Sequence, residues 1–402
     1  FFVDTPSCNP KPSYLVAPVM TRTAMFGLKL WAALFLIASR AVRAFSPSFV
    51  NHGRHELHAE IPNTDATQAP AQVIGVVAPL DYCGPYPCLA LRFPKLEGVP
   101  VWNFIVDTGA HLNTIQRKFK EKYELPQFEG LPKPITTAGV GGEFFPGDLV
   151  ILGDETLAGL PAEQRDVVFV RSLTAVALSR ASPTDGILGS TFCSMFPGGV
   201  EFDWYGTDGD PPTFCFYFST ETTAAPPTQG MTRIPMNHFF GLFTVTITMS
   251  GNKIMALLDT GSPITILNGK AAQEAGIHPT DTKRVDNATS LKLPDHPHLK
   301  VGGIDGRPMD VVRSVSKGAV TVGDMPLGKG HVYVGTIPAF SVMQTVANEN
   351  NAEAPSAILG LDFLQRTYRM IVRGKDPCEL WIEELDESKF KYKAPMKKEA
   401  LT

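Results

Sequence analysis

The sequence has no marked excess of charge of either sign. Its 36 basic side chains nearly balance 40 acidic ones and leave a net charge of −4. Because proteins that bind nucleic acids usually carry a strongly basic surface, this balance gives no support to a DNA or RNA partner. The apolar fraction of 44% and the charged fraction of 19% also exclude a disordered chain and a multi-span membrane protein.

The cysteines form no metal-binding pattern. Six are present, but none forms a C-x-x-C pair and none lies near a histidine doublet, so we expect neither a metal site nor a cofactor. Cys83 and Cys88 enclose the turn sequence Gly84-Pro85-Tyr86-Pro87. Two interpretations fit this spacing equally well: a disulfide in an oxidising compartment, or two free thiols in the core.

The composition is unfavourable for long helices. The chain contains 35 glycines and 34 prolines in 402 residues, and both residues interrupt helices and favour turns. At about 150 residues per domain, this length corresponds to two or three units. We therefore expect a protein of short strands and turns rather than a helical bundle.

The chain does not begin with methionine, and Met20 and Met25 are the candidate start residues. From Met20 onward, basic residues accompany the apolar run of residues 30–38, which is too short to span a bilayer. The small-residue pattern Val42-Arg43-Ala44 then fits a signal-peptidase site. We expect residues 1–44 to comprise upstream translated sequence and a signal peptide; a buried N-terminal helix is the alternative.

A flexible leader is predicted at residues 45–72, because this segment is rich in Pro, Ala, Thr and Asn and lacks a periodic apolar pattern. Phe45 resembles the start of transit segments in algae whose plastids are reached through the secretory route. Glu56, Glu60 and Asp65 make the segment more acidic than a transit peptide usually is. These features predict entry into the secretory pathway, with a secreted, vacuolar or plastid destination and no stable membrane span after signal removal.

The most informative feature is an internal repeat. Asp107-Thr108-Gly109 recurs 152 residues later as Asp259-Thr260-Gly261. An apolar segment precedes each triplet, and a second apolar segment and a helix-like segment follow it. These segments are residues 104–106, 112–115 and 116–125 around the first triplet and residues 256–258, 264–267 and 269–277 around the second. One triplet alone would indicate a surface turn, but two in equivalent surroundings are not explained in that way.

A second motif repeats farther along the chain. Gly186-Ile187-Leu188-Gly189 corresponds to Ala357-Ile358-Leu359-Gly360. Residues 242–249 alternate in polarity, and Gly251-Asn252 provides a tight turn into the next strand. Asp259 is therefore predicted to lie on a short loop at the end of a hairpin strand.

The order strand, Asp-Thr-Gly, strand, short helix, glycine-rich hairpin and hydrophobic-hydrophobic-Gly resembles the aspartic peptidases over residues 75–385. Each repeat is similar to a retropepsin-type unit, so the chain resembles two such units in tandem, in a pepsin-like bilobal arrangement. The resemblance implies an all-β fold with short helices, in which two β-barrel lobes are related by a pseudo-twofold axis. It also implies a polypeptide substrate and a monomer that acts as an intramolecular pseudo-dimer. The residues assigned to the core are Ile187, Leu188, Ile358 and Leu359.

Composition also predicts the domain boundaries. Residues 219–233 are rich in Thr, Ala, Pro and Gln and lack periodicity, which indicates a linker. The two lobes are then residues 73–218 and 234–386. The lysine-rich residues 387–402 are expected to form a solvated basic tail.

The resemblance assigns Asp107 and Asp259 to a catalytic dyad. Two carboxyl groups at hydrogen-bonding distance cannot both ionise easily, so they share one proton and titrate together. One carboxylate can then activate a water molecule while the protonated partner polarises the peptide carbonyl. The threonines of the triplets would bond across the lobe interface and the glycines would allow close backbone approach. These supporting residues are Thr108, Gly109, Thr260 and Gly261.

Two glycine-rich segments resemble the flaps that cover substrate in retropepsins. An ordinary glycine-rich hairpin is the alternative for each. Neither segment contains a tyrosine, in contrast to pepsin-like flaps. The residues concerned are Gly139, Val140, Gly141 and Gly142 in the first segment and Gly302, Gly303, Ile304, Asp305 and Gly306 in the second.

One asymmetry lies beside the triplets, where Ala110 follows the first and Ser262 follows the second. By resemblance to pepsin-like sites, the Ser262 hydroxyl would donate a hydrogen bond to Asp259, which would favour its ionised form. This predicts that Asp259 is mainly ionised and Asp107 mainly protonated. The alternative is that Ser262 bonds only to backbone, as serine hydroxyls often do.

Two functions remain from the sequence. The first is an aspartic-type endopeptidase, and the alternative is a weakly active or inactive peptide-binding or scaffold protein of the same fold. The presence of both aspartates and both threonines favours the enzyme, because a binding protein has no need for two carboxylates that repel each other. Phosphoryl transfer is disfavoured, since no Walker-type loop is present.

Overall fold

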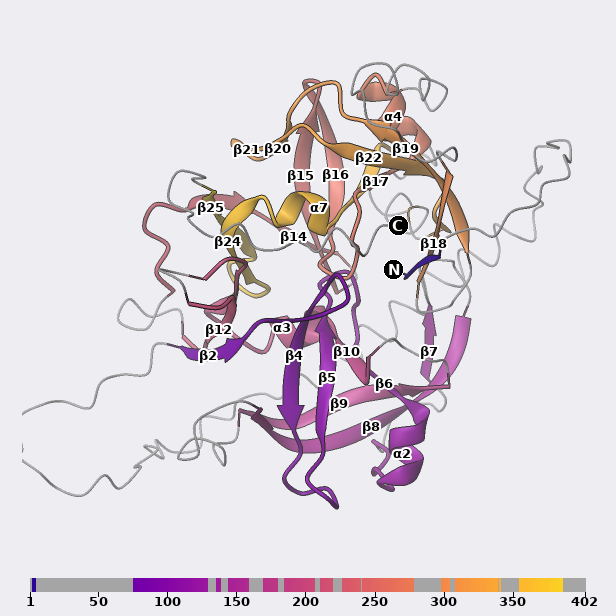
Figure 1. Ribbon diagram of the computed structural model, residues 1–402, viewed down its shortest axis with the longest axis vertical. Coiled ribbons are helices and arrows are strands. Elements are labelled where there is room, and N and C mark those ends of the chain that lie inside the picture. The colour runs from indigo at the N-terminus through magenta and orange to yellow at the C-terminus, as the bar shows by residue number, and fades with distance from the viewer. Residues whose placement is uncertain are drawn as a thin grey trace, which may run out of the picture.

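The computed structural model describes residues 2–4, 75–128, 135–138, 144–158, 169–179, 184–206, 210–219, 226–239, 241–277, 298–303, 308–338, 340 and 354–385. These residues form three sheets of eleven, eight and six strands. Short helices accompany the sheets. The prediction of an all-β, two-lobed fold is therefore confirmed (Figure 1).

The eight-stranded sheet builds the N-terminal lobe, in the order β3-β4-β5-β10-β6-β9-β8-β7. Pairing of β4 with β8 closes six of these strands into a barrel. The short helices α2 (Arg117–Lys122) and α3 (Ser190–Cys193) accompany it. The strands are β3 (Asp81–Cys83), β4 (Tyr86–Arg92), β5 (Val101–Val106), β6 (Thr114–Gln116), β7 (Ile135–Ala138), β8 (Phe144–Leu157), β9 (Val170–Leu178) and β10 (Gly186–Leu188).

The eleven-stranded sheet builds the C-terminal lobe. Its main path is β1-β18-β19-β22-β17-β23-β16-β15-β20-β21, and β14 pairs with β15. Two short helices, α4 (Gly269–Glu274) and α7 (Leu361–Leu364), belong to this lobe. The strands are β1 (Phe2–Asp4), β14 (Asn237–Phe239), β15 (Leu242–Met249), β16 (Asn252–Leu258), β17 (Ile266–Leu267), β18 (His298–Gly302), β19 (Met309–Val315), β20 (Val320–Val322), β21 (Met325–Gly328), β22 (His331–Gly335) and β23 (Ser356–Leu359).

The same strand crossing recurs in both lobes. The Ile-Leu-Gly strand runs parallel to the strand that ends at the aspartate, as β10 with β5 and β23 with β16. It runs antiparallel to the short strand that follows the aspartate, as β10 with β6 and β23 with β17. Both aspartate loops are thus held on one side by a buried hydrophobic strand.

The third sheet joins the lobes. Its order is β13-β25-β24-β11-β12-β2, and the pairing of β11 with β24 links the N-terminal and C-terminal halves. In Figure 1 it lies at the left, between the lower lobe and the upper lobe. Its strands are β2 (Val76–Pro79), β11 (Gly199–Asp203), β12 (Thr213–Tyr217), β13 (Thr232–Pro235), β24 (Thr367–Arg373) and β25 (Glu379–Glu384).

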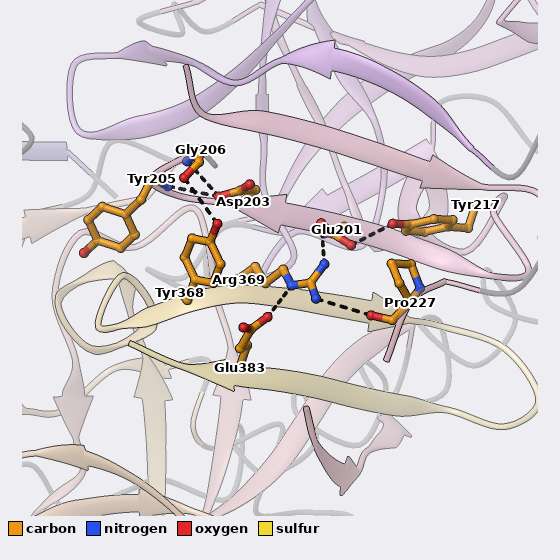
Figure 2. A network of polar contacts seen from close by, with 9 residues as sticks. All are labelled: Glu201, Asp203, Tyr205, Gly206, Tyr217, Pro227, Tyr368, Arg369 and Glu383. Atoms are coloured by element: carbon orange, nitrogen blue, oxygen red, sulfur yellow. Dashed lines mark hydrogen bonds and ion pairs between the residues drawn. The ribbon is translucent and has the colours of Figure 1, made fainter. Parts of the chain in front are cut away.

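A network centred on Arg369 reinforces this junction (Figure 2). Arg369 of β24 donates to Glu383 of β25 and lies 3.6 Å from a carboxylate oxygen of Glu201 in β11. The Tyr217 hydroxyl donates to the other oxygen of Glu201 at 2.8 Å. Burial raises the pKa of Glu201, against the opposing effects of Tyr217 and Arg369. Charged groups from both halves therefore satisfy one another inside the connecting sheet.

Several sequence expectations are refined by these elements. The helix-like segments shorten to α2 and α4, which have six residues each. The turn between β15 and β16 is formed by Ser250 and Gly251, both with positive φ, whereas Asn252 already belongs to β16. Thr232 and Arg233, at the end of the predicted linker, belong to β13. The predicted leader and basic tail lie outside the described residues.

The repeated Ile-Leu-Gly strands are core elements, as predicted. Leu188, Ile358 and Leu359 are fully buried, and Ile187 is half-buried. The alternation predicted for residues 242–249 also places Phe243, Val245 and Ile247 of β15 in the interior. A continuous hydrophobic cluster extends through both lobes and the connecting sheet.

Candidate active site

Both aspartates lie directly after a buried strand and are fixed by the same backbone contact. The Asp107 N–H donates to the Leu188 carbonyl at 2.9 Å, and the Asp259 N–H donates to the Leu359 carbonyl at 3.1 Å. The Ile-Leu-Gly strands therefore fix the backbone positions of the two aspartates through equivalent hydrogen bonds.

The threonines of the triplets cross between the two loops. The Thr108 hydroxyl donates to the Leu258 carbonyl at 2.8 Å and accepts the Thr260 N–H at 3.1 Å. The Thr260 hydroxyl donates to the Val106 carbonyl at 2.6 Å and accepts the Thr108 N–H at 3.0 Å. Both threonines are fully buried. Because every bond joins one loop to the other, the two aspartates are held as a single unit.

The glycines of the triplets are required by close packing. A Cβ added to Gly109 would lie 2.3 Å from the Cγ of Asp259, and one added to Gly261 would lie 2.2 Å from the Cγ of Asp107. No side chain fits at either position without displacing the opposite carboxyl group. Each loop thus depends on a glycine for the approach of the other loop's aspartate.

The two carboxyl groups are close enough to hydrogen-bond to each other. Asp259 is only 3% exposed. Burial raises its pKa well above the ordinary range, and the charge of Asp107 and the hydrogen bond to Asp107 raise it further. Asp107 Oδ1 accepts the N–H groups of Gly109 at 2.8 Å and Ala110 at 3.1 Å, whereas Asp259 Oδ1 accepts that of Gly261 at 2.9 Å. This environment favours the protonated form of Asp259.

This assignment reverses the sequence expectation for the pair. The Ser262 hydroxyl donates to the Ile264 carbonyl at 2.7 Å rather than to Asp259. Ser262 is fully buried and stabilises its own loop. The prediction that Ser262 keeps Asp259 ionised was wrong, because the hydroxyl has a nearer backbone acceptor within the same turn.

Two further polar side chains hold the glycines that follow the Ile-Leu strands, and the sequence analysis did not identify them. The Asn113 side-chain oxygen accepts the Gly189 N–H at 2.9 Å. At the equivalent position in the C-terminal lobe, the Thr265 hydroxyl accepts the Gly360 N–H at 3.0 Å. Asn113 and Thr265 each follow their aspartate by six residues. That identical spacing was the available signal.

The C-terminal lobe adds a carboxyl group behind its loop. The Thr265 hydroxyl donates to Asp362 Oδ1 at 2.6 Å and the Thr265 N–H donates to Asp362 Oδ2 at 3.0 Å. Burial raises the pKa of Asp362 to about 6, although these hydrogen bonds and the Arg366 charge favour its ionised form. Since both oxygens accept hydrogen bonds, the ionised carboxylate matches this arrangement best.

The predicted flap tips fall largely outside the described residues. Strands β7 and β8 pair as an antiparallel hairpin up to Ala138 and Phe144, on either side of residues 139–142. In the C-terminal lobe, Gly302 is the last residue of β18 and Gly303 follows it, whereas residues 304–306 are not described. A flap role for these segments stays a prediction.

Comparison with known proteins adds a family assignment. The sequence profile of the aspartyl protease family matches residues 94–192 and 245–363, more than half of the chain. A solved retropepsin-like aspartic protease from Rickettsia conorii is similar, with 17% identity, coverage of 38% of this chain and 90% of that chain, and a TM-score of 0.23. A comparison with curated protein sequences finds no match.

The described residues contain no helix that is long and apolar enough to cross a membrane. Each matched region contains one Asp-Thr-Gly triplet and one Ile-Leu-Gly strand, which are the elements that form the paired loops. The chain belongs to the aspartyl protease family, whose profile matches it in two separate regions.

Proposed function

We propose that this protein is an aspartic-type endopeptidase that uses Asp107 and Asp259 as its catalytic pair. The observation that carries the proposal is the close carboxyl pair, in which the pKa of Asp259 is raised and Asp107 accepts two backbone N–H groups. A purely binding protein would gain nothing from burying two carboxyl groups that disfavour each other's ionisation. The alternative of an inactive peptide-binding protein is therefore less well supported.

The geometry divides the roles between the two aspartates. Asp107, as the carboxylate, takes a proton from a water molecule while the water oxygen attacks the carbonyl carbon of the peptide bond. Asp259 gives its proton to the carbonyl oxygen, so that a neutral gem-diol forms. Asp107 then gives the proton that it took from water to the amide nitrogen, and Asp259 takes a proton from a gem-diol hydroxyl as the C–N bond breaks. The products are a carboxylic acid and an amine, and the pair again has Asp107 ionised and Asp259 protonated.

The fixed environment of the pair makes this cycle feasible. The threonine bonds between the loops keep both carboxyl groups in place, so no reorganisation is needed when charge moves between them. One chain supplies both aspartates, so we propose that the monomer is the active form.

The test is a cleavage assay of the purified full chain against a peptide library between pH 3 and pH 8, with products identified by mass spectrometry. We expect cleavage within extended peptides, and the Asp107→Asn variant is the matched negative control. A folded wild-type protein that cleaves no peptide at any of these pH values would contradict the proposal. Equal cleavage by the control variant would contradict the assignment of the pair.

We also propose that the protein enters the secretory pathway through its N-terminal signal. The Cys83–Cys88 disulfide supports this location, because disulfides persist mainly in oxidising compartments. N-terminal sequencing of native protein should give a mature terminus at or beyond Phe45. Peptides from residues 26–40 in the mature protein would contradict a cleaved signal.

A further inference from the structure

A small apolar cluster lies on one face of the N-terminal sheet, separate from the main core. It is formed by Tyr86, Cys88 and Ile105, with Cys83 and Ile187 packed against it. Ile105 is two residues before Asp107, and Ile187 lies opposite Ile105 in the neighbouring strand. The cluster therefore extends along the sheet toward the catalytic pair.

The strand register places Tyr86 beside Asp107. Cys88 of β4 lies opposite Ile105 of β5 in an antiparallel pair. Continuing that register by two positions brings Tyr86 opposite Asp107, on the same face of the sheet. Residues opposite each other in such a pair have Cβ atoms about 4.5–5.5 Å apart. Burial raises the pKa of Tyr86, and the charges of Asp107 and Asp259 raise it further, which agrees with this position.

The Tyr86 hydroxyl differs from those of three tyrosines near the connecting sheet. Tyr217 donates to Glu201, and Tyr205 and Tyr368 each bond to a backbone carbonyl. Tyr86 is only 5% exposed, and its hydroxyl makes no hydrogen bond to another described residue, yet this oxygen is not among the fully buried polar atoms that lack a partner. The hydroxyl is therefore accessible at the surface of the cluster, and its hydrogen-bonding capacity is free for a ligand.

The turn that carries Tyr86 is covalently closed. A disulfide joins Cys83 of β3 to Cys88 of β4 across this turn. The other side of the hairpin reaches the C-terminal half, where the Gln365 amide donates to the Tyr82 hydroxyl at 3.4 Å. The hairpin is thus held at both ends, which limits the positions that Tyr86 can occupy.

The C-terminal lobe has a different residue at the equivalent place. Thr244 of β15 lies opposite Leu257 of β16, so the same two-residue step brings Leu242 opposite Asp259. Leu242 has no group that can donate a hydrogen bond. The two aspartates therefore have one polar and one apolar neighbour.

We propose that Tyr86 contacts substrate, its hydroxyl donating a hydrogen bond to a backbone carbonyl of the bound peptide on the Asp107 side, and that the Cys83–Cys88 disulfide positions it there. This inference rests on the proposed peptidase function. It makes the two sides of the cleft chemically unequal: the side near Tyr86 favours a polar backbone contact, and the side near Leu242 favours an apolar one.

The first experiment compares Tyr86→Phe with the wild type and with Tyr123→Phe, a control in the same lobe whose ring packs against Trp102 at the end of α2. We expect kcat/KM for a cleaved peptide to fall about tenfold in Tyr86→Phe, as for the loss of one hydrogen bond to substrate. Tyr123→Phe should retain wild-type kcat/KM. The melting temperature and both limbs of the pH profile should stay unchanged in Tyr86→Phe, because the carboxyl pair is intact. Unchanged kcat/KM in Tyr86→Phe would overturn the proposal.

Binding separates this inference from the peptidase proposal. Calorimetry with a peptide in which a hydroxyethylene group replaces the cleaved bond should show about tenfold weaker binding to Tyr86→Phe. If the wild type cleaves nothing but binds this peptide in a Tyr86-dependent way, the peptidase proposal fails and the contact stands. If the wild type cleaves peptides and neither kcat/KM nor binding depends on Tyr86, the contact is wrong and the peptidase proposal stands.

The disulfide is tested by the Cys83→Ala/Cys88→Ala double variant, alone and combined with Tyr86→Phe. If the disulfide acts by positioning Tyr86, its removal should lower kcat/KM several-fold in the wild-type background and little in the Tyr86→Phe background. Equal losses in both backgrounds would show that the disulfide supports only the fold.

Discussion

The two lobes fasten equivalent loops with different side chains. In the N-terminal lobe the amide of Asn113 accepts the Gly189 N–H, whereas in the C-terminal lobe the hydroxyl of Thr265 accepts the Gly360 N–H. The C-terminal lobe then needs Asp362 to accept the Thr265 hydroxyl proton. The backbone requires an acceptor at this point, and either a neutral amide or a hydroxyl backed by a carboxylate can supply it.

The lobes also differ in the side chain that they bury at equivalent positions of β8 and β20. Strand β4 of the N-terminal lobe corresponds to β15 of the C-terminal lobe, and β8, which pairs with β4, corresponds to β20, which pairs with β15. When the registers of these strands are aligned on the two aspartates, Glu155 of β8 corresponds to Val320 of β20. Both residues are fully buried. Within the described part of the chain, the Glu155 carboxyl oxygens have no hydrogen-bond partner of normal geometry, and burial raises the pKa of Glu155 to about 9 against weak backbone contacts from Glu155 and Leu173. At this position, the N-terminal lobe therefore buries a carboxyl group that stays protonated at neutral pH, whereas the C-terminal lobe buries a valine.

The largest expected effect comes from removing either member of the pair, and it tests whether the two lobes contribute equally to catalysis. Asp107→Asn and Asp259→Asn should each lower kcat/KM by at least about a thousandfold, because base and acid act on the same proton. The double variant should be no worse than either single one. Retained folding is checked by circular dichroism. A single variant with near-normal turnover would show that the lobes do not act as one pair.

The crossed threonine bonds should be equally important in both lobes. Thr108→Val and Thr260→Val each leave a buried carbonyl and a buried N–H without a partner, so each should lower the free energy of unfolding by about 2–4 kcal/mol. Chemical denaturation measures this change, and Thr246→Val, on the exposed face of β15, is the control. If the two variants lower the free energy of unfolding by very different amounts, the bonds made by the two threonines do not contribute equally to stability.

Glu155 should make the N-terminal lobe the more sensitive one to alkaline pH. The unfolded chain loses the Glu155 proton above its ordinary pKa of 4.5, while the folded chain keeps it up to about pH 9. The folded state binds more protons in this window, so wild-type stability falls as pH rises through it. Glu155→Gln should therefore be more stable than the wild type by about 2 kcal/mol at pH 8, with little gain at pH 4.5, since the buried amide offsets part of the effect.

Thermal unfolding at several pH values measures this difference. Glu121→Gln is the matched control, because Glu121 lies exposed on α2. A pH-independent effect of Glu155→Gln would mean that Glu155 is ionised in the folded protein.

The smallest effect is expected at Ser262, the residue that distinguishes the two triplets. Ser262→Ala removes a bond to the Ile264 carbonyl and should lower stability by about 1 kcal/mol. The acidic limb of the kcat/KM profile should not move, because the hydroxyl does not contact Asp259. A shift of that limb toward higher pH would restore the idea that Ser262 stabilises the Asp259 carboxylate.

Much of the fold was readable in the sequence because it depends on local patterns. Alternation in residues 242–249 predicted β15, and the apolar run before each aspartate predicted β5 and β16. The repeat of Asp-Thr-Gly and Ile-Leu-Gly predicted two equivalent lobes. The helix lengths and the exact turn residues were less accurate, since short helices end where tertiary contacts begin.

The sequence by itself indicated which residues meet at the centre, because its repeated Asp-Thr-Gly and Ile-Leu-Gly motifs resemble those of the aspartic peptidases, and that resemblance implies paired loops with crossing threonines. Only the tertiary structure decided the pKa of Asp259 and the contacts of the residues around the pair. The raised pKa of Asp259 and the place of Tyr86 beside Asp107 depend on contacts between segments distant in the chain, and the choice of Ile264 as the partner of Ser262 depends on how the loop is folded. Burial and hydrogen-bond competition arise only when those segments pack together, so no local pattern in the sequence contains them.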